Sequence, residues 1–423
     1  MPDFRIAYRP FPQQQAYFRR KVSMPSARWD DLMHGEHAHG FMAAGVARMD
    51  VLEDIRQAVQ DAIDRGEGFP AFQARMRSII ADKGWIGGAG DESEARRAWR
   101  MRMIYQTNLR TSYMAGRWEE LQKFPYLRYQ HNTINNPRHE HQAWDGLVLA
   151  SNDPWWDTHY PPNGWGCRCT VTGIGKGRMR VLGKDGPDAA PNPSEGDPPP
   201  EWAYHPGKAA RSLPAAESFG RKVMALPPEW RKAALDDAQN RRVDWFGDFV
   251  PLVAQVRQEI ATGRTFAQGY ATPVGFVPSD IIGALATGAG ERAASGAAVT
   301  FSPPTLSTAL VALNDRALYH SLRDHKAVGR PGIQAAIARE VGTLPYWVSD
   351  PETIVLYEPA RAQATEMLVF ARALADGRYA TLHIDVGLKE GRTREPVQAN
   401  WVRTVEIKTR QQLGGFIKLR GEW

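Results

Sequence analysis

The stretch THYPPNGWGCRC, from Thr158 to Cys169, contains both cysteines of a chain of 423 residues. A turn rich in Pro, Asn and Gly leads into the two thiols, which a single residue separates. Residues two apart on a β-strand face the same side. If this segment is extended, Cys167 and Cys169 present their thiols to one common partner.

Two histidines upstream repeat this spacing. His139 and His141 would also share one face of a strand, and two adjacent strands would then bring two imidazoles and two thiolates together. Such a set suits a tetrahedral structural zinc ion, with His159 and Asp145 as reserve ligands. The alternative is that these side chains only pack and hydrogen-bond in a β-turn module, because C-x-C differs from the usual zinc spacing. The predicted metal ligands are His139, His141, Cys167 and Cys169.

The composition is that of an ordinary soluble globular protein, with 43% hydrophobic and 24% charged residues. The length predicts two or three domains. Two cysteines exclude a disulfide framework. We find no secretory signal pattern and no apolar run long enough to span a bilayer, so we expect no membrane partner and synthesis in the cytoplasm.

The net charge of +6 is unevenly distributed. Residues 96–128 contain eight Lys or Arg against two Glu, and residues 389–420 contain eight against three. Both stretches could meet nucleic acid or an acidic protein surface. The alternative for each is a solvated helix face or sheet edge.

The region before Pro125 has helical periodicity. Apolar residues at steps of three and four predict helices over 47–66 and 69–84. Residues 91–124 predict one long helix of roughly 50 Å, at about 1.5 Å per residue. Strand-like pieces follow over 126–150.

The rest of the chain first loses and then regains apolar periodicity. A segment rich in Pro, Gly and Asp predicts a linker, and a short helical zone follows it. Leucines at near-helical spacing over 304–325 precede several β-type runs, and the alternation over 379–386 predicts a half-buried strand. We therefore expect an α+β protein with a mainly helical N-terminal domain carrying a small β-module, a Pro-rich linker and a compact α+β C-terminal domain. The expected boundaries are 1–178, 179–270 and 271–423.

Three motifs in the first part carry a family resemblance: YFRRKVSMPSARWDDL, TNLRTSYMAGRWEEL and RHEHQAWDGLVLASNDPWWDTHYPPNGWGCRC. Through them, residues 10–178 resemble the phage-Mu-type head morphogenesis (minor head) proteins. The resemblance implies a phage or prophage protein made in the bacterial host cytoplasm and carried in the virion. It would lie in the capsid interior or beside the portal, with portal or major capsid proteins and packaged DNA as partners. No enzymatic activity is implied.

The last part carries a second resemblance through ALYHSLRDHKAVGRPG, LPYWVSDPETIVLYE and ANWVRTVEIKT. It resembles phage nuclease domains of the barnase/EndoU/colicin E5-D/RelE-like group. The resemblance implies a metal-independent, toxin-like ribonuclease (RNase) acting on an RNA substrate.

Metal-free RNA cleavage needs a proton donor and acceptor near neutral pH and cations for the phosphate. We expect His320 as base or acid, Arg323 and Lys326 as phosphate ligands and Thr404 as an orienting donor, with His325 as the rival to His320. The leading hypothesis is therefore a minor head protein fused to a ribonuclease. The alternative is a purely structural capsid protein whose last domain binds partners or DNA without catalysis.

Overall fold

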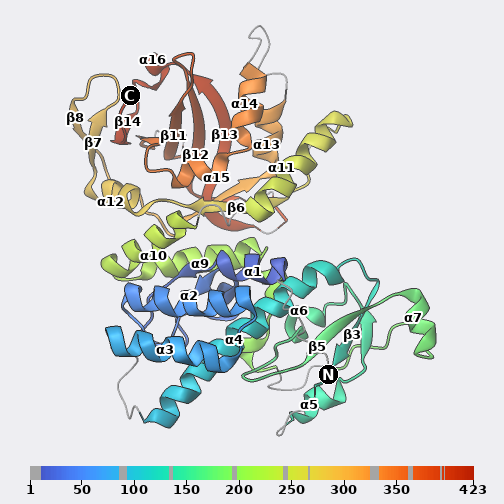
Figure 1. The fold of residues 1–423 in the computed structure, drawn as a ribbon. Helices are drawn as coiled ribbons and strands as arrows, with labels where there is room; N and C mark the ends of the chain where they lie inside the picture. The colour runs from blue at the N-terminus through green and yellow to red at the C-terminus, as the bar shows by residue number, and fades with distance from the viewer. Residues whose placement is uncertain are drawn as a thin grey trace, which may run out of the picture. The chain divides into compact units, whose positions relative to one another are not determined.

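The computed structural model divides the chain into two compact units, Met1–Ser212 and Leu213–Trp423 (Figure 1). The expected α+β class is confirmed, because helices dominate the first unit and a large sheet occupies the second. The structure describes residues 11–84, 93–132, 137–192, 198–241, 246–264, 267–323, 333–360, 365–390, 393–394 and 396–423.

The long helix α4 (Glu94–Leu121) organises the first unit. It contacts α1 (Pro12–Arg19), α2 (Met49–Arg65), α3 (Phe69–Lys83) and α8 (Pro206–Ala209). The apolar stripes of α2 and α3 form a buried cluster with Met101 of α4, as their periodicity predicts. The three expected helices are thus confirmed.

A three-stranded antiparallel sheet completes the core of the first unit. Its central strand β3 (Tyr126–Gln130) pairs with β4 (Val148–Ala150) and β5 (Thr170–Ile174). The strand expected at His139 and His141 is wrong, because these residues lie in the short helix α5 (His139–Ala143). This segment lacks the β-branched residues that favour strands, and an acid in its first turn suits a helix. The smaller elements are β1 (Val22–Ser23), η1 (His34–Ala38), β2 (Gly40–Phe41), α6 (Trp156–His159), α7 (Lys176–Val181) and η2 (Pro200–Trp202).

The second unit is built on a nine-stranded sheet in the order β6-β9-β13-β12-β11-β10-β14-β7-β8. The paired strands β12 and β13 are its longest, and β12 is buried on both faces from Tyr379 to Val386. The expected half-buried strand is therefore wrong, because apolar residues of neighbouring strands and loops also cover the second face. The strands are β6 (Ala271–Phe276), β7 (Ala289–Arg292), β8 (Ala298–Thr300), β9 (Leu310–Asn314), β10 (Ile354–Glu358), β11 (Met367–Ala373), β12 (Tyr379–Glu390), β13 (Val397–Lys408) and β14 (Ile417–Arg420).

The leucine-rich region over 304–325 is not one helix. Its centre is the buried strand β9, which pairs with β6 and β13. The Asn314 side chain accepts the backbone N–H of Ala317 at 2.8 Å and begins helix α13 there. The helices of this unit are α9 (Leu213–Ala225), α10 (Pro228–Asn240), α11 (Phe246–Ala261), α12 (Ser279–Thr287), α13 (Asp315–Leu322), α14 (Ile333–Val341), α15 (Leu344–Ser349) and α16 (Arg410–Leu413).

The division of the chain differs from the expected boundaries at residues 178 and 270. The end of the expected linker packs on the first unit, where the Arg20 guanidinium donates to the Ala210 carbonyl at 2.7 Å. The helical zone after it, α9 to α11, contacts β6 in the second unit. Its apolar residues are too sparse in sequence to indicate which unit they join.

None of the helices in the described parts of the chain is both long and apolar enough to cross a membrane.

The contact between α1 and α4 yields a stability prediction. A Cβ at Gly116 would lie 2.7 Å from the backbone nitrogen of Gln14. Because this neighbour is backbone, Gly116→Ala should destabilise the protein by about 1–3 kcal/mol through overpacking. Gly177→Ala on α7 is the matched control, since a Cβ there meets nothing within 4 Å. Urea unfolding measures both variants, and an equal effect of the two would contradict the close packing of α1 on α4.

Candidate metal centre

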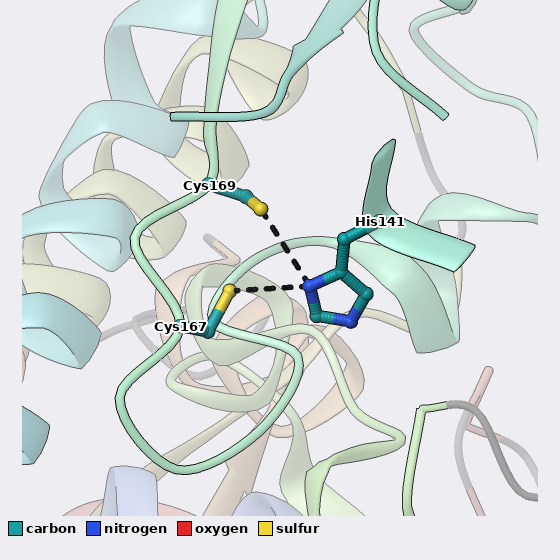
Figure 2. Close-up of side chains that lie close together, drawn as sticks. All are labelled: His141, Cys167 and Cys169. Carbon is teal, nitrogen blue, oxygen red and sulfur yellow. Dashed lines mark hydrogen bonds between the residues drawn. The ribbon is translucent and has the colours of Figure 1, made fainter. Parts of the chain in front are cut away.

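Three buried side chains converge beside the three-stranded sheet: His141, Cys167 and Cys169 (Figure 2). The Nδ1 atom of His141 lies 3.8 Å from the Cys167 sulfur and 3.6 Å from the Cys169 sulfur. In a tetrahedral zinc site with Zn–S of about 2.3 Å and Zn–N of about 2.0–2.1 Å, neighbouring N and S atoms are roughly 3.6 Å apart. Both N–S distances therefore suit such a tetrahedron, and all three donor atoms lie within 4.8 Å of one another.

A second histidine lies beside this group because of the pairing of β3 with β5. The last pair of this ladder joins Gln130 to Thr170, so the next residues outward are His131 and Cys169. The Nδ1 atom of His131 lies 3.5 Å from the Cys169 sulfur. Its Nε2 atom is buried and has no hydrogen-bond partner in the described part of the chain. His131 is therefore an imidazole beside Cys169, in place of the expected His139, but the three converging donors do not include it.

Of the predicted ligands, the structure brings together His141, Cys167 and Cys169, while His139 is exposed at the start of α5. Residues two apart on a helix are rotated by about 200°, at 3.6 residues per turn. His139 and His141 therefore face different sides of α5. Only strand pairing could have indicated His131. It lies one residue beyond the end of β3, opposite Cys169, the residue before β5.

The two reserve ligands have other contacts. The Asp145 carboxylate accepts the backbone N–H of His131 at 2.9 Å, which fixes the chain at this histidine. His159 stacks on the Trp155 ring, and its Nδ1 lies 3.1 Å from the Trp155 carbonyl oxygen. Asp145 therefore fixes the backbone at His131, next to the centre.

The loop that carries the thiols is held at several points. The Cys167 N–H donates to the Gly164 carbonyl at 3.1 Å, and the Arg110 guanidinium of α4 donates to the Cys169 carbonyl at 3.1 Å. Tyr129 of β3 donates its hydroxyl to the side chain of buried Asn163 at 3.1 Å. The thiols are thus positioned by a turn, by the long helix and by the central strand.

The thiol pair has asymmetric electrostatics. The hydrogen bond from Cys169, supported by His141, holds the pKa of Cys167 well below its ordinary value, although burial opposes this. The same contact and burial raise the pKa of Cys169. Cys167 therefore ionises more readily than Cys169, and the thiolate is the form that binds metal.

The segment that encloses this centre has known relatives. Residues 53–172, which include His131 and the three converging donors, match the family model described as Phage Mu protein F like protein. That segment is therefore similar to this family. We refer to residues 53–172 as the Mu F-like segment.

Two relatives show how far the similarity extends. The chain is 34% identical over 194 residues to a protein of Escherichia phage Mu named "Putative capsid assembly protein F", covering 43% of this chain and 44% of that protein. It is 33% identical over 163 residues to the "Mu-like prophage FluMu F protein" of Haemophilus influenzae, covering 37% of this chain and 39% of that protein. The chain therefore spans less than half the length of these relatives. No solved structure matches the chain.

The predicted ribonuclease residues lie in the second unit. His320 is exposed on α13, whereas Thr404 on β13 is only 5% exposed. The neighbours of these two residues are in contact, because the Ser321 hydroxyl accepts the N–H of Val405 at 3.0 Å. The Arg323 guanidinium lies 5.3 Å from the centre of the Tyr319 ring. Lys326 and His325 lie outside the described residues.

Sequence analysis missed a polar group on the sheet next to Thr404. His383 of β12 lies opposite Thr404 in the strand register, and its Nε2 is 3.0 Å from the Thr381 hydroxyl. Arg403, the residue before Thr404 on β13, donates from Nε to the Asp385 carboxylate at 2.9 Å. This arginine is thus already paired with an acid, which weakens it as a phosphate ligand.

Proposed function

We propose that this chain is a phage head assembly protein whose Mu F-like segment is held together by a structural zinc ion. The observation that carries the proposal is that one segment both matches the Mu F-like family and encloses the converging Cys and His side chains. The name of the phage Mu relative, a putative capsid assembly protein, supports the first part. The donor geometry supports the second.

The assembly role fits a protein made in the bacterial host cytoplasm that enters the virion, inside the capsid or beside the portal. Its partners would be the portal or major capsid proteins. The basic stretch on α4 gives little support for a packaged-DNA partner, because several of its arginines make internal contacts. Arg100 donates to the Ala44 carbonyl, Arg110 to the Cys169 carbonyl and Arg117 to the Glu120 carboxylate.

The zinc ion would have a structural role. Two thiolates and the imidazoles of His131 and His141 fill a tetrahedral site and leave no open position for a reacting water. The surroundings are apolar and aromatic: Trp144 stacks on His141 with ring centres 5.1 Å apart, and both cysteines belong to the same buried cluster. A closed metal site in this aromatic cluster would join the short helix α5 to the thiol-bearing loop, and neither is stable alone.

Elemental analysis of the purified full chain should find about one equivalent of zinc. Cys167→Ser and His141→Ala should lose the metal, because each removes a donor. His131→Ala should also lose most of it, whereas His139→Ala is the matched control and should retain it. His131→Ala and His139→Ala leave the cysteines intact, so the comparison of these two variants holds even if Cys167→Ser fails to fold. Zinc-free wild-type protein, or loss in His139→Ala alone, would refute the centre.

The assembly role is tested in a lysogen whose copy of this gene is deleted. Without the chain, induction should yield few DNA-filled heads by electron microscopy, and supplying the wild-type gene should restore them. Tagged protein should remain with the purified heads through a density gradient. Normal numbers of filled heads in the deletion strain would contradict the role.

A ribonuclease activity of the second unit stays a separate prediction. It is supported by the resemblance, by exposed His320 and by the contact of α13 with β13 next to Thr404. The full chain should cleave tRNA in the presence of EDTA, and His320→Ala should be slower by about 10²–10⁴-fold because a general base is lost. Arg316→Ala, also exposed on α13, is the control. Intact RNA at high protein concentration would favour the purely structural alternative.

A further inference from the structure

The first unit contains a mostly apolar cavity of about 770 Å³. Its walls come from the loop before η1, from α4, from the thiol-bearing loop and from the segment at η2. Three of its tryptophans remain highly exposed: Trp29 at 53%, Trp99 at 59% and Trp165 at 48%. Because these side chains come from three separate segments, they form one apolar rim rather than isolated surface residues. Such a rim is typical of an interaction site.

Lys21 also lines this cavity although it is only 3% exposed. Its ammonium lies over the Tyr17 ring at 5.1 Å and the Phe18 ring at 5.6 Å. No described residue gives this ammonium a hydrogen bond or an ion pair, and Glu201, the acidic residue of the lining, is not paired with it. Burial, and then the neighbouring charge of Arg20, lower the pKa of Lys21 to about 7.

Burying an ammonium without an anion is costly, which is why the pKa of Lys21 falls, and proteins normally pair or hydrogen-bond such groups. The surrounding apolar walls could have accommodated a methionine or leucine instead. The position of Lys21 at the wall of an open cavity therefore suits an anion that arrives from outside. A carboxylate would form a charge-assisted hydrogen bond there, which is stronger in a water-poor site.

We infer that this cavity is a docking site for a segment of a partner polypeptide that carries one carboxylate flanked by apolar side chains. The carboxylate meets Lys21, and the apolar side chains cover the tryptophan rim. A small molecule in the cavity would leave much of the tryptophan rim exposed, whereas a peptide would fill the cavity and also cover the rim. Nucleic acid fits poorly, because most of the lining is apolar and Arg100, its second strong cation, already donates to the Ala44 carbonyl. This site is separate from the donors of the proposed zinc centre.

The test is a selection of random twelve-residue peptides on the immobilised full chain, followed by affinity measurement of the selected peptides by fluorescence polarisation. The selected peptides should share one Asp, Glu or terminal carboxylate next to Leu, Phe or Trp. Replacing that acid with its amide should weaken binding by about tenfold or more, because it leaves a buried charge unpaired.

Lys21→Met keeps the shape of the side chain and should weaken the same peptides to a similar extent. It should not lower the melting temperature, because it removes an unpaired buried charge. Lys176→Met, on exposed α7, is the matched control and should bind normally. The absence of a selected motif, a motif without an acid, or unchanged binding to Lys21→Met would each overturn the inference.

Discussion

The contact of one imidazole with two cysteine sulfurs is the constraint on which the first unit depends. His141 comes from a helix of five residues, and Cys167 and Cys169 come from the loop that leads into β5. Elements this short are not stable alone. The two sulfurs and the His141 imidazole meet at one buried point, and the Asp145 carboxylate fixes the backbone at the neighbouring His131. The aromatic cluster of the small sheet then packs around that point.

The thiol-bearing loop also reaches the surface, through Trp165. Trp165 lies two residues before Cys167 and packs edge-on against the Trp202 ring, with ring centres 5.0 Å apart. Both tryptophans line the cavity that Lys21 also lines. A centre that fixes the thiols therefore also fixes one wall of the proposed docking site. The proposed structural zinc ion would thereby act in the proposed assembly role without any catalytic step.

The sequence was informative where local pattern decides structure and less informative where pairing across the chain decides it. Apolar periodicity predicted α2 and α3, because both helices contribute apolar residues to one buried cluster. The thiol pair was recognised from its spacing, but the ligand at His131 depends on the register of β3 with β5, which spacing does not contain. Likewise, β9 was taken for a helix because a short apolar run fits both structures, and only its pairing with β6 and β13 distinguishes them.

The most direct measurement is X-ray absorption at the zinc edge on the purified full chain. A closed centre of the kind described predicts a first shell of two sulfurs at about 2.3 Å and two nitrogens at about 2.0–2.1 Å. The His131→Ala variant should lose one nitrogen or the whole signal, and His139→Ala should reproduce the wild-type spectrum. A shell of oxygen and nitrogen atoms without sulfur, or no bound zinc, would contradict the metal centre and leave the thiols and imidazoles as a packed core alone.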